Sequence, residues 1–110
     1  MTASLTAQQR AAIIAWAEKT PCVKAVRLFG SRAKESSGSE SDVDLAVTIE
    51  PDHSNLEGIF ACEREGWESE LSSAIELRAE LKPFDQTIAP KVFASCQEAS
   101  ILLWQRKSAD

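Results

Sequence analysis

Apolar and polar residues are arranged along the chain in patterns that predict helices and strands in turn. From residue 5 to 19 the apolar positions recur at helical spacing, and Thr6 with Gln9 has the form of a capping box at the start of that segment. Residues 23–29 are apolar and rich in β-branched side chains, which is typical of a buried strand. We therefore expect the chain to begin with a helix followed by a strand.

Strict alternation predicts the second strand. Every second residue from 43 to 49 is apolar, so one face of this strand belongs to the core and the acids Asp42 and Asp44 share the other face. The preceding residues 31–41 have no hydrophobic period and predict a short helical turn followed by a solvated loop.

The middle of the chain predicts a long helix. A second capping box at residues 54–57 precedes an apolar stripe that continues at helical spacing to Ile75. Gly58 and Gly66 lie inside this segment, and each costs about 1 kcal/mol relative to alanine in a helix. We expect the first turns to be frayed or broken.

The last part of the chain predicts a third strand and a final helix. Residues 81–89 alternate weakly, which predicts a strand on which Asp85 faces away from the core. Pro90 suits the first turn of a helix, and residues 101–104 fit either the last turn of that helix or a short closing strand. This order of elements indicates an α/β fold with helices against a small sheet.

Composition narrows the possible functions. The chain has 110 residues, 44% of them hydrophobic, which suits one globular domain over residues 1–110. A formal net charge of −5 disfavours nucleic acid as a partner. Three widely spaced cysteines give no disulfide framework, and the chain shows neither a signal peptide nor an apolar run long enough to span a membrane. We expect a cytoplasmic protein without membrane contact.

Asp42 and Asp44 are the first candidates for chemistry. Same-face positions on a strand place their Cα atoms roughly 6–7 Å apart, so the two carboxylates repel each other unless a cation lies between them. Two hard oxygen ligands suit Mg²⁺. The alternative for an isolated Asp-x-Asp pair is that both side chains face water at the start of the strand.

Gly30 and Ser31 supply a second feature at the end of the preceding strand. A residue without Cβ lets backbone amides approach an anion, and the neighbouring hydroxyl can donate to it. The spacing is not that of a Walker loop. Arg32 and Lys34 follow directly and add positive charge, or they are solvated loop cations.

The segments 28–34 and 41–47 together resemble the minimal nucleotidyltransferase (MNT) domains of the DNA polymerase β superfamily. In that family a Gly-Ser pair is followed after ten residues by Asp-x-Asp, and ten residues separate Ser31 from Asp42 here. The resemblance implies a nucleotidyltransferase fold, a small mixed β-sheet flanked by helices.

The resemblance also implies roles for the site residues. Gly30 and Ser31 would hold the β- and γ-phosphates of ATP or another nucleoside triphosphate, with Arg32 and Lys34 adding local positive charge. Asp42 and Asp44 would bind two Mg²⁺ ions. The family needs a third carboxylate on the next core strand, for metal binding and for proton removal from the attacking hydroxyl, and Asp85 is the candidate.

Two functions of different classes follow from the resemblance. The first is a Mg²⁺-dependent enzyme that transfers AMP from ATP to a hydroxyl of a partner protein, as in antitoxins of HEPN/MNT toxin–antitoxin pairs. The second is a catalytically degenerate module that neutralises or scaffolds a HEPN-type partner by contact, suggested by Glu35 in place of a common glycine and by the unusual surroundings of Asp85. Either one allows a homo- or hetero-oligomer. An aminoglycoside-modifying role is disfavoured, because kanamycin nucleotidyltransferase carries an additional helical domain.

Overall fold

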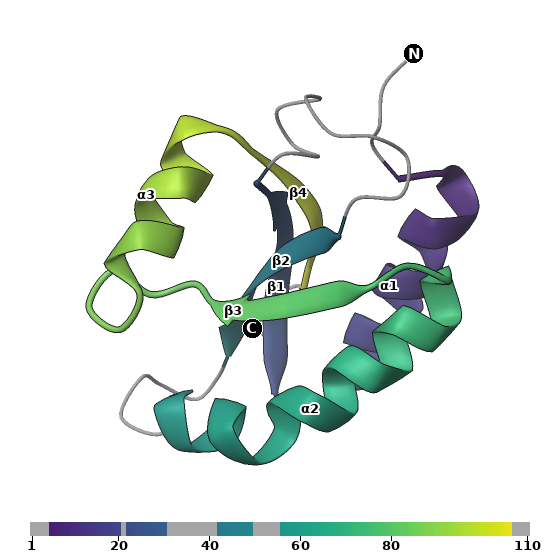
Figure 1. The fold of residues 1–110 in the computed structure, drawn as a ribbon, viewed down its shortest axis with the longest axis horizontal. Coiled ribbons are helices and arrows are strands. Elements are labelled where there is room, and N and C mark those ends of the chain that lie inside the picture. The colour runs from purple at the N-terminus through teal and green to yellow at the C-terminus, as the bar shows by residue number, and fades with distance from the viewer. Residues whose placement is uncertain (1–4, 21, 31–41, 50–55, 107–110) are drawn as a thin grey trace.

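Four strands form one sheet with helices on both of its faces (Figure 1). The computed structural model describes residues 5–20, 22–30, 42–49 and 56–106. The elements, in chain order, are α1 (Ala7–Glu18), β1 (Val23–Phe29), β2 (Val43–Ile49), α2 (Leu56–Ile75), β3 (Ala79–Pro83), α3 (Pro90–Glu98) and β4 (Ser100–Gln105). The strand order is β3-β2-β1-β4. β3 runs parallel to β2 and the other pairs are antiparallel, which confirms a small mixed sheet flanked by helices.

The main core lies between the sheet and the helices α1 and α2. On one face of β2, Val43, Leu45 and Val47 are fully buried against these helices. Trp67 of α2 makes edge-on ring contacts with Trp16 of α1 and with Phe60, at centroid distances of 5.8 and 6.0 Å. The alternation in β2 therefore determines which face of the sheet these two helices cover.

The opposite face of the sheet carries α3 and a smaller apolar cluster, formed by Phe29, Ala46 and Cys96 with Phe84 and Val92 at its margin. The even-numbered residues of β2 lie on this face because neighbouring residues of a strand point to opposite sides. It is thus the face on which Asp44 lies, and Asp44 remains partly exposed there.

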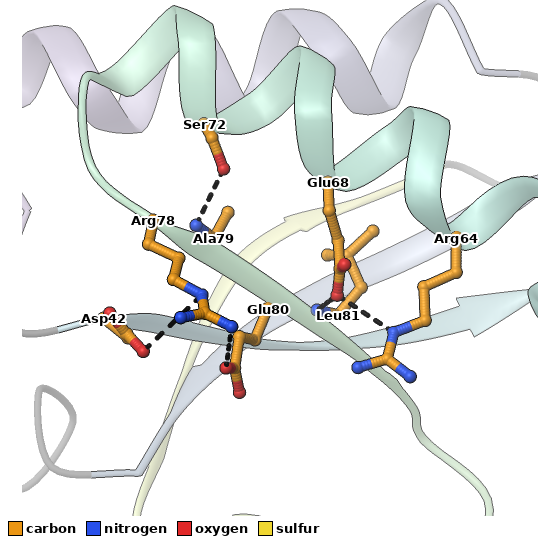
Figure 2. Close-up of polar contacts among 8 residues, drawn as sticks. All are labelled: Asp42, Arg64, Glu68, Ser72, Arg78, Ala79, Glu80 and Leu81. Atoms are coloured by element: carbon orange, nitrogen blue, oxygen red, sulfur yellow. Dashed lines mark hydrogen bonds and ion pairs between the residues drawn. The ribbon is translucent and has the colours of Figure 1, made fainter.

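Side chains of α2 cap the outer edge of β3 (Figure 2). Ala79 N donates to Ser72 Oγ at 3.0 Å, and Leu81 N donates to Glu68 Oε2 at 2.8 Å. The two acceptor residues are four positions apart on the helix, a rise of about 6 Å, and the two donor residues are two positions apart on the strand, a rise of about 6.6 Å. The acceptors on α2 are therefore spaced like the donors on β3. Pro83 has no N–H to satisfy. The edge donors of β3 are thus paired, and the position of the strand along α2 is set by hydrogen bonds.

Several sequence predictions are confirmed. Thr6 and Gln9 form the capping box, with Gln9 N donating to Thr6 Oγ1 and Thr6 N donating to Gln9 Oε1. Residues 101–104 belong to β4, so the strand alternative is the correct one. The predicted loop at 31–41 and the capping residue Ser54 lie outside the described residues.

Two predictions are wrong. The helix α2 continues through Gly58 and Gly66, because its packing against the core outweighs the low helix propensity of glycine. The third strand covers Ala79–Pro83 rather than residues 81–89. Its signal is the alternation of apolar residues 77, 79 and 81 with charged residues between them, a stronger pattern than the one after Pro83.

None of the helices in the described ranges combines the length and the hydrophobicity of a bilayer span.

Gly66 provides a test of the helical assignment. It lies on the exposed side of α2, and an added Cβ would meet no atom within 4 Å. We expect Gly66→Ala to raise the free energy of unfolding by about 0.5–1 kcal/mol, because alanine has the higher helix propensity. Urea denaturation followed by circular dichroism measures this difference. A loss of stability would show that the helix is not continuous at this position.

Candidate active site

The acidic residues gather at the start of β2. Asp42 immediately precedes this strand, and Asp44 pairs in register with Phe29 of β1 on one side and with Glu80 of β3 on the other. Glu80 lies on the same face as Asp44, because its neighbours Ala79 and Leu81 belong to the main core. Neighbouring strands are about 4.8 Å apart, so two carboxylates from adjacent strands share one small region of the surface.

Gly30 lies directly beside the Asp44 carboxylate. Its φ of +78° is a left-handed conformation that favours glycine. A Cβ on Gly30 would come within 2.5 Å of Asp44 Oδ2, closer than van der Waals contact allows. The turn after β1 therefore needs a residue without a side chain, and its backbone and the Asp44 carboxylate converge on one place.

The remaining predicted site residues of this turn, Ser31, Arg32 and Lys34, lie outside the described residues. Their contribution stays a prediction from the sequence.

Asp85 does not lie on the third strand. It follows β3 by two residues, and its Oδ1 accepts hydrogen bonds from Thr87 N at 2.9 Å and Ile88 N at 3.0 Å. This is the geometry of an aspartate that stabilises a turn. The expected placement of Asp85 on the strand is therefore wrong, because the strand ends at Pro83.

Glu80 is a third carboxylate on the face of Asp44, and the sequence pattern did not single it out. Its position could have been found from the alternation of residues 77–82, in which the charged residues Arg78, Glu80 and Lys82 occupy one face. That segment is short and directly follows a long helix, so its alternation of apolar and charged residues is hard to distinguish from the end of the helical pattern. The pairing of Glu80 with Asp44 depends on strand register and cannot be read from local sequence.

Arg78 lies between two of the acids, as Figure 2 shows. Its Nε is 4.0 Å from Asp42 Oδ2 and its Nη2 is 3.6 Å from Glu80 Oε2. The side chain is 73% exposed, so these ion pairs are strongly solvated and weak.

The electrostatic environment of Asp44 is unfavourable for its charge. Burial raises the pKa of the Asp44 carboxyl above its ordinary value, and the negative charges of Glu80 and Asp42 raise this pKa further, while Lys82 acts in the opposite direction. A half-buried carboxylate among other carboxylates is stabilised by any added cation.

The donor set suits a hard divalent ion. Asp42, Asp44 and Glu80 offer carboxylate oxygens, the ligands that Mg²⁺ prefers, and the space left by the missing Cβ of Gly30 adjoins one of them. Within the described ranges no three His, Cys, Asp or Glu side chains are arranged to hold a metal ion in the present conformation. The carboxylates fit such an ion by chemistry and by position, and their side chains would have to reorient to bind it.

A substitution at Gly30 tests the close approach to Asp44. Gly30→Ala would adopt a strained φ and push its Cβ against the Asp44 carboxylate. We expect it to lower the free energy of unfolding by about 1–3 kcal/mol, measured by urea denaturation. The matched Gly66→Ala change adds the same methyl group without a clash, and it should not destabilise the fold. Equal effects at both glycines would contradict the geometry described for Gly30.

The raised pKa of Asp44 predicts a pH-dependent stability. The pKa of the Asp44 carboxyl is higher in the folded chain than in the unfolded chain, where it is about 3.9. Such a group stabilises the fold fully at a pH below the unfolded pKa, and this stabilisation is lost as the pH rises through the folded pKa. In EDTA at about pH 7, Asp44→Asn should therefore have a higher Tm than the wild type, with the difference vanishing below about pH 4.

Glu65→Gln is the control for the Asp44 experiment, because Glu65 is exposed on α2 and its substitution changes the net charge equally. A Tm gain of the same size in Glu65→Gln would indicate a general charge effect rather than a property of the site.

Comparisons with known proteins identify the family of the chain and the structures that share its fold. A family model described as polymerase beta, nucleotidyltransferase matches residues 11–109. No curated protein sequence matches the chain. Among solved structures, a chain of a toxin–antitoxin crystal structure with AMP-PNP superposes with a TM-score of 0.68 at 20% identity, covering 89% of this chain and 74% of that chain.

A second similar chain comes from the structure of a tri-AMPylated Shewanella oneidensis HEPN toxin in complex with its MNT antitoxin. It gives a TM-score of 0.63 at 19% identity and covers 89% of this chain and 71% of that chain. At these identities the likeness concerns the fold. Because the family model spans nearly all of its residues, the chain belongs to the polymerase beta nucleotidyltransferase family.

Proposed function

We propose that this chain transfers AMP from ATP to a hydroxyl group in a Mg²⁺-dependent reaction that releases pyrophosphate. Its family makes it a nucleotidyltransferase. The observation that carries the proposal is the convergence of Gly30, Asp44 and Glu80 at one end of the sheet, with an acidic cluster next to a turn that tolerates no side chain.

In this proposal Gly30 and Ser31 bind the β- and γ-phosphates, and Arg32 and Lys34 add positive charge beside them. Lys82 lies near Asp44 and adds another cation on the same face. Asp42, Asp44 and Glu80 would hold two Mg²⁺ ions, which when bound neutralise phosphate charge and polarise the reacting groups.

Glu80, rather than Asp85, is the third carboxylate of this proposal. Its strand pairs with β2, and its side chain is 30% exposed and lies on the face of Asp44. From there it can accept the proton of an attacking hydroxyl. The Asp85 carboxylate is engaged in the turn after β3, where it accepts two backbone hydrogen bonds.

The proposed acceptor is a hydroxyl on a HEPN-type protein partner, and the chain would act as the antitoxin of such a pair. Support comes from the fold, which is similar to chains found in a toxin–antitoxin structure with AMP-PNP and in a complex with an AMPylated HEPN toxin. In this proposal residues 1–110 form a single MNT domain that acts in the cytoplasm. The three cysteines are all free, as is usual in a reducing compartment.

One observation favours a second candidate, a degenerate module that neutralises its partner by contact. Arg78 already pairs with Asp42 and Glu80, and no ready-made metal group exists among the described side chains. In this case the carboxylates would serve no reaction.

The proposals are tested with ATP labelled at the α-phosphate, Mg²⁺ and a purified HEPN-type protein. Label should appear on the HEPN protein, and the double change Asp42→Ala with Asp44→Ala should abolish both the transfer and the neutralisation of the toxin. Neutralisation that persists in the double variant would support the contact module instead.

A second comparison separates the two candidate third carboxylates. We expect Glu80→Gln to reduce the transfer rate about a hundredfold or more, because it removes a proton acceptor and a metal ligand. Asp85→Asn keeps an oxygen for the turn and should retain most of the rate. The reverse result would restore Asp85 to the site.

A further inference from the structure

We infer that Arg78 is a built-in counter-ion of the carboxylate site, whose positive charge opposes the binding of the divalent ion by Asp42 and Glu80. The inference rests on the proposed function, because it concerns the same carboxylates. It makes Arg78 a positioning residue that controls how readily the site takes up metal.

The backbone holds Arg78 at the entrance of the site. Val43 N donates to Arg78 O at 2.8 Å, which anchors the residue to the start of β2. The anchored backbone and the alternation of β3 place its side chain on the face of Glu80 and Asp44. The Arg78 guanidinium lies between the two acids, with Nη2 3.6 Å from Glu80 Oε2 and Nε 4.0 Å from Asp42 Oδ2 (Figure 2).

The negative charge of the site explains why the Arg78 guanidinium lies beside the carboxylates. Three carboxylates, those of Asp42, Asp44 and Glu80, lie at one end of the sheet. The positive side chains beside them are Lys82 and Arg78, which offset part of this negative charge. A guanidinium remains charged at every physiological pH and presents several donors in a planar fork, so it can serve two carboxylates at once. Without Arg78, two of the three acids would lose a positive neighbour.

Arg78 and a divalent ion compete for the charge of the same two carboxylates. Mg²⁺ binds oxygen directly at about 2.0–2.1 Å and prefers a regular octahedral arrangement. The Arg78 nitrogens lie 3.6 and 4.0 Å from one oxygen each of Glu80 and Asp42, so a divalent ion bound to these carboxylates would lie close to the positive guanidinium and be repelled by it. Because the Arg78 side chain is 73% exposed, it can rotate into solvent without breaking any part of the core. Pairing with Arg78 therefore weakens the binding of metal to these carboxylates.

Direct metal titration tests the inference without catalysis. Mn²⁺ is added to the protein, and the signal of free Mn²⁺ is followed by electron paramagnetic resonance. We expect Arg78→Gln to bind Mn²⁺ about two- to fivefold more tightly than the wild type, the gain set by the loss of weak exposed ion pairs. The same variant should have a lower Tm in EDTA, so metal affinity and metal-free stability change in opposite directions.

Arg64→Gln is the matched control. Arg64 also forms an ion pair, with its Nε 2.9 Å from Glu68 Oε2, but this pair lies at the outer edge of β3, away from Asp42 (Figure 2). The variant changes the net charge equally, and its Mn²⁺ affinity should stay close to that of the wild type. An equal gain in both variants, or no gain in Arg78→Gln, would overturn the inference.

An Asp44→Asn variant separates failure of this inference from failure of the proposed function. Mn²⁺ binding that depends on Asp44 but is unaffected by Arg78→Gln leaves the nucleotidyltransferase proposal standing and rejects the role of Arg78. If neither the wild type nor Arg78→Gln shows binding that depends on Asp44, the metal site itself is rejected and both proposals fall.

Discussion

The position of β2 between β1 and β3 is the constraint on which the rest of the structure depends. Its register with β1 brings Asp44 beside Phe29 and the adjacent Gly30, and its register with β3 brings Glu80 to the other side. A slip of one residue in β2 would turn its acids into the core and its apolar side chains towards solvent. The fully buried Val43, Leu45 and Val47 prevent this slip, so the core and the acidic site are determined by the same alternation.

The site retains charges that folding alone would not favour. Asp44 is half-buried beside Glu80 and Asp42, and both the burial and the neighbouring charges disfavour its ionised form. Lys82 and Arg78 offset part of this cost within the chain. Concentrated like charges that a protein keeps at one place are typical of functional sites, where a ligand of opposite charge completes the balance. The proposed metal-dependent reaction would give this imbalance a chemical purpose.

The helix α2 supports the site without contributing a residue to it. One side of α2 packs Trp67, Leu71 and Ile75 into the core, while Glu68 and Ser72 accept hydrogen bonds from the outer edge of β3. Buried or half-buried backbone donors must be paired, so these two side chains determine where β3 lies along the helix. The location of Glu80 beside Asp44 is thus a consequence of contacts made on the opposite side of its strand.

The sequence by itself determined the elements whose signals are local. The capping box of α1, the strand β1, the strict alternation of β2 and the spacing from Ser31 to Asp42 were all readable, because each depends on neighbours a few residues apart. The tertiary structure alone decided that Glu80 pairs with Asp44, that Arg78 stands between Asp42 and Glu80, and that Asp85 serves a turn. These outcomes depend on register between strands separated by a long helix, and register follows from burial and hydrogen bonding across the whole sheet rather than from any short stretch of residues.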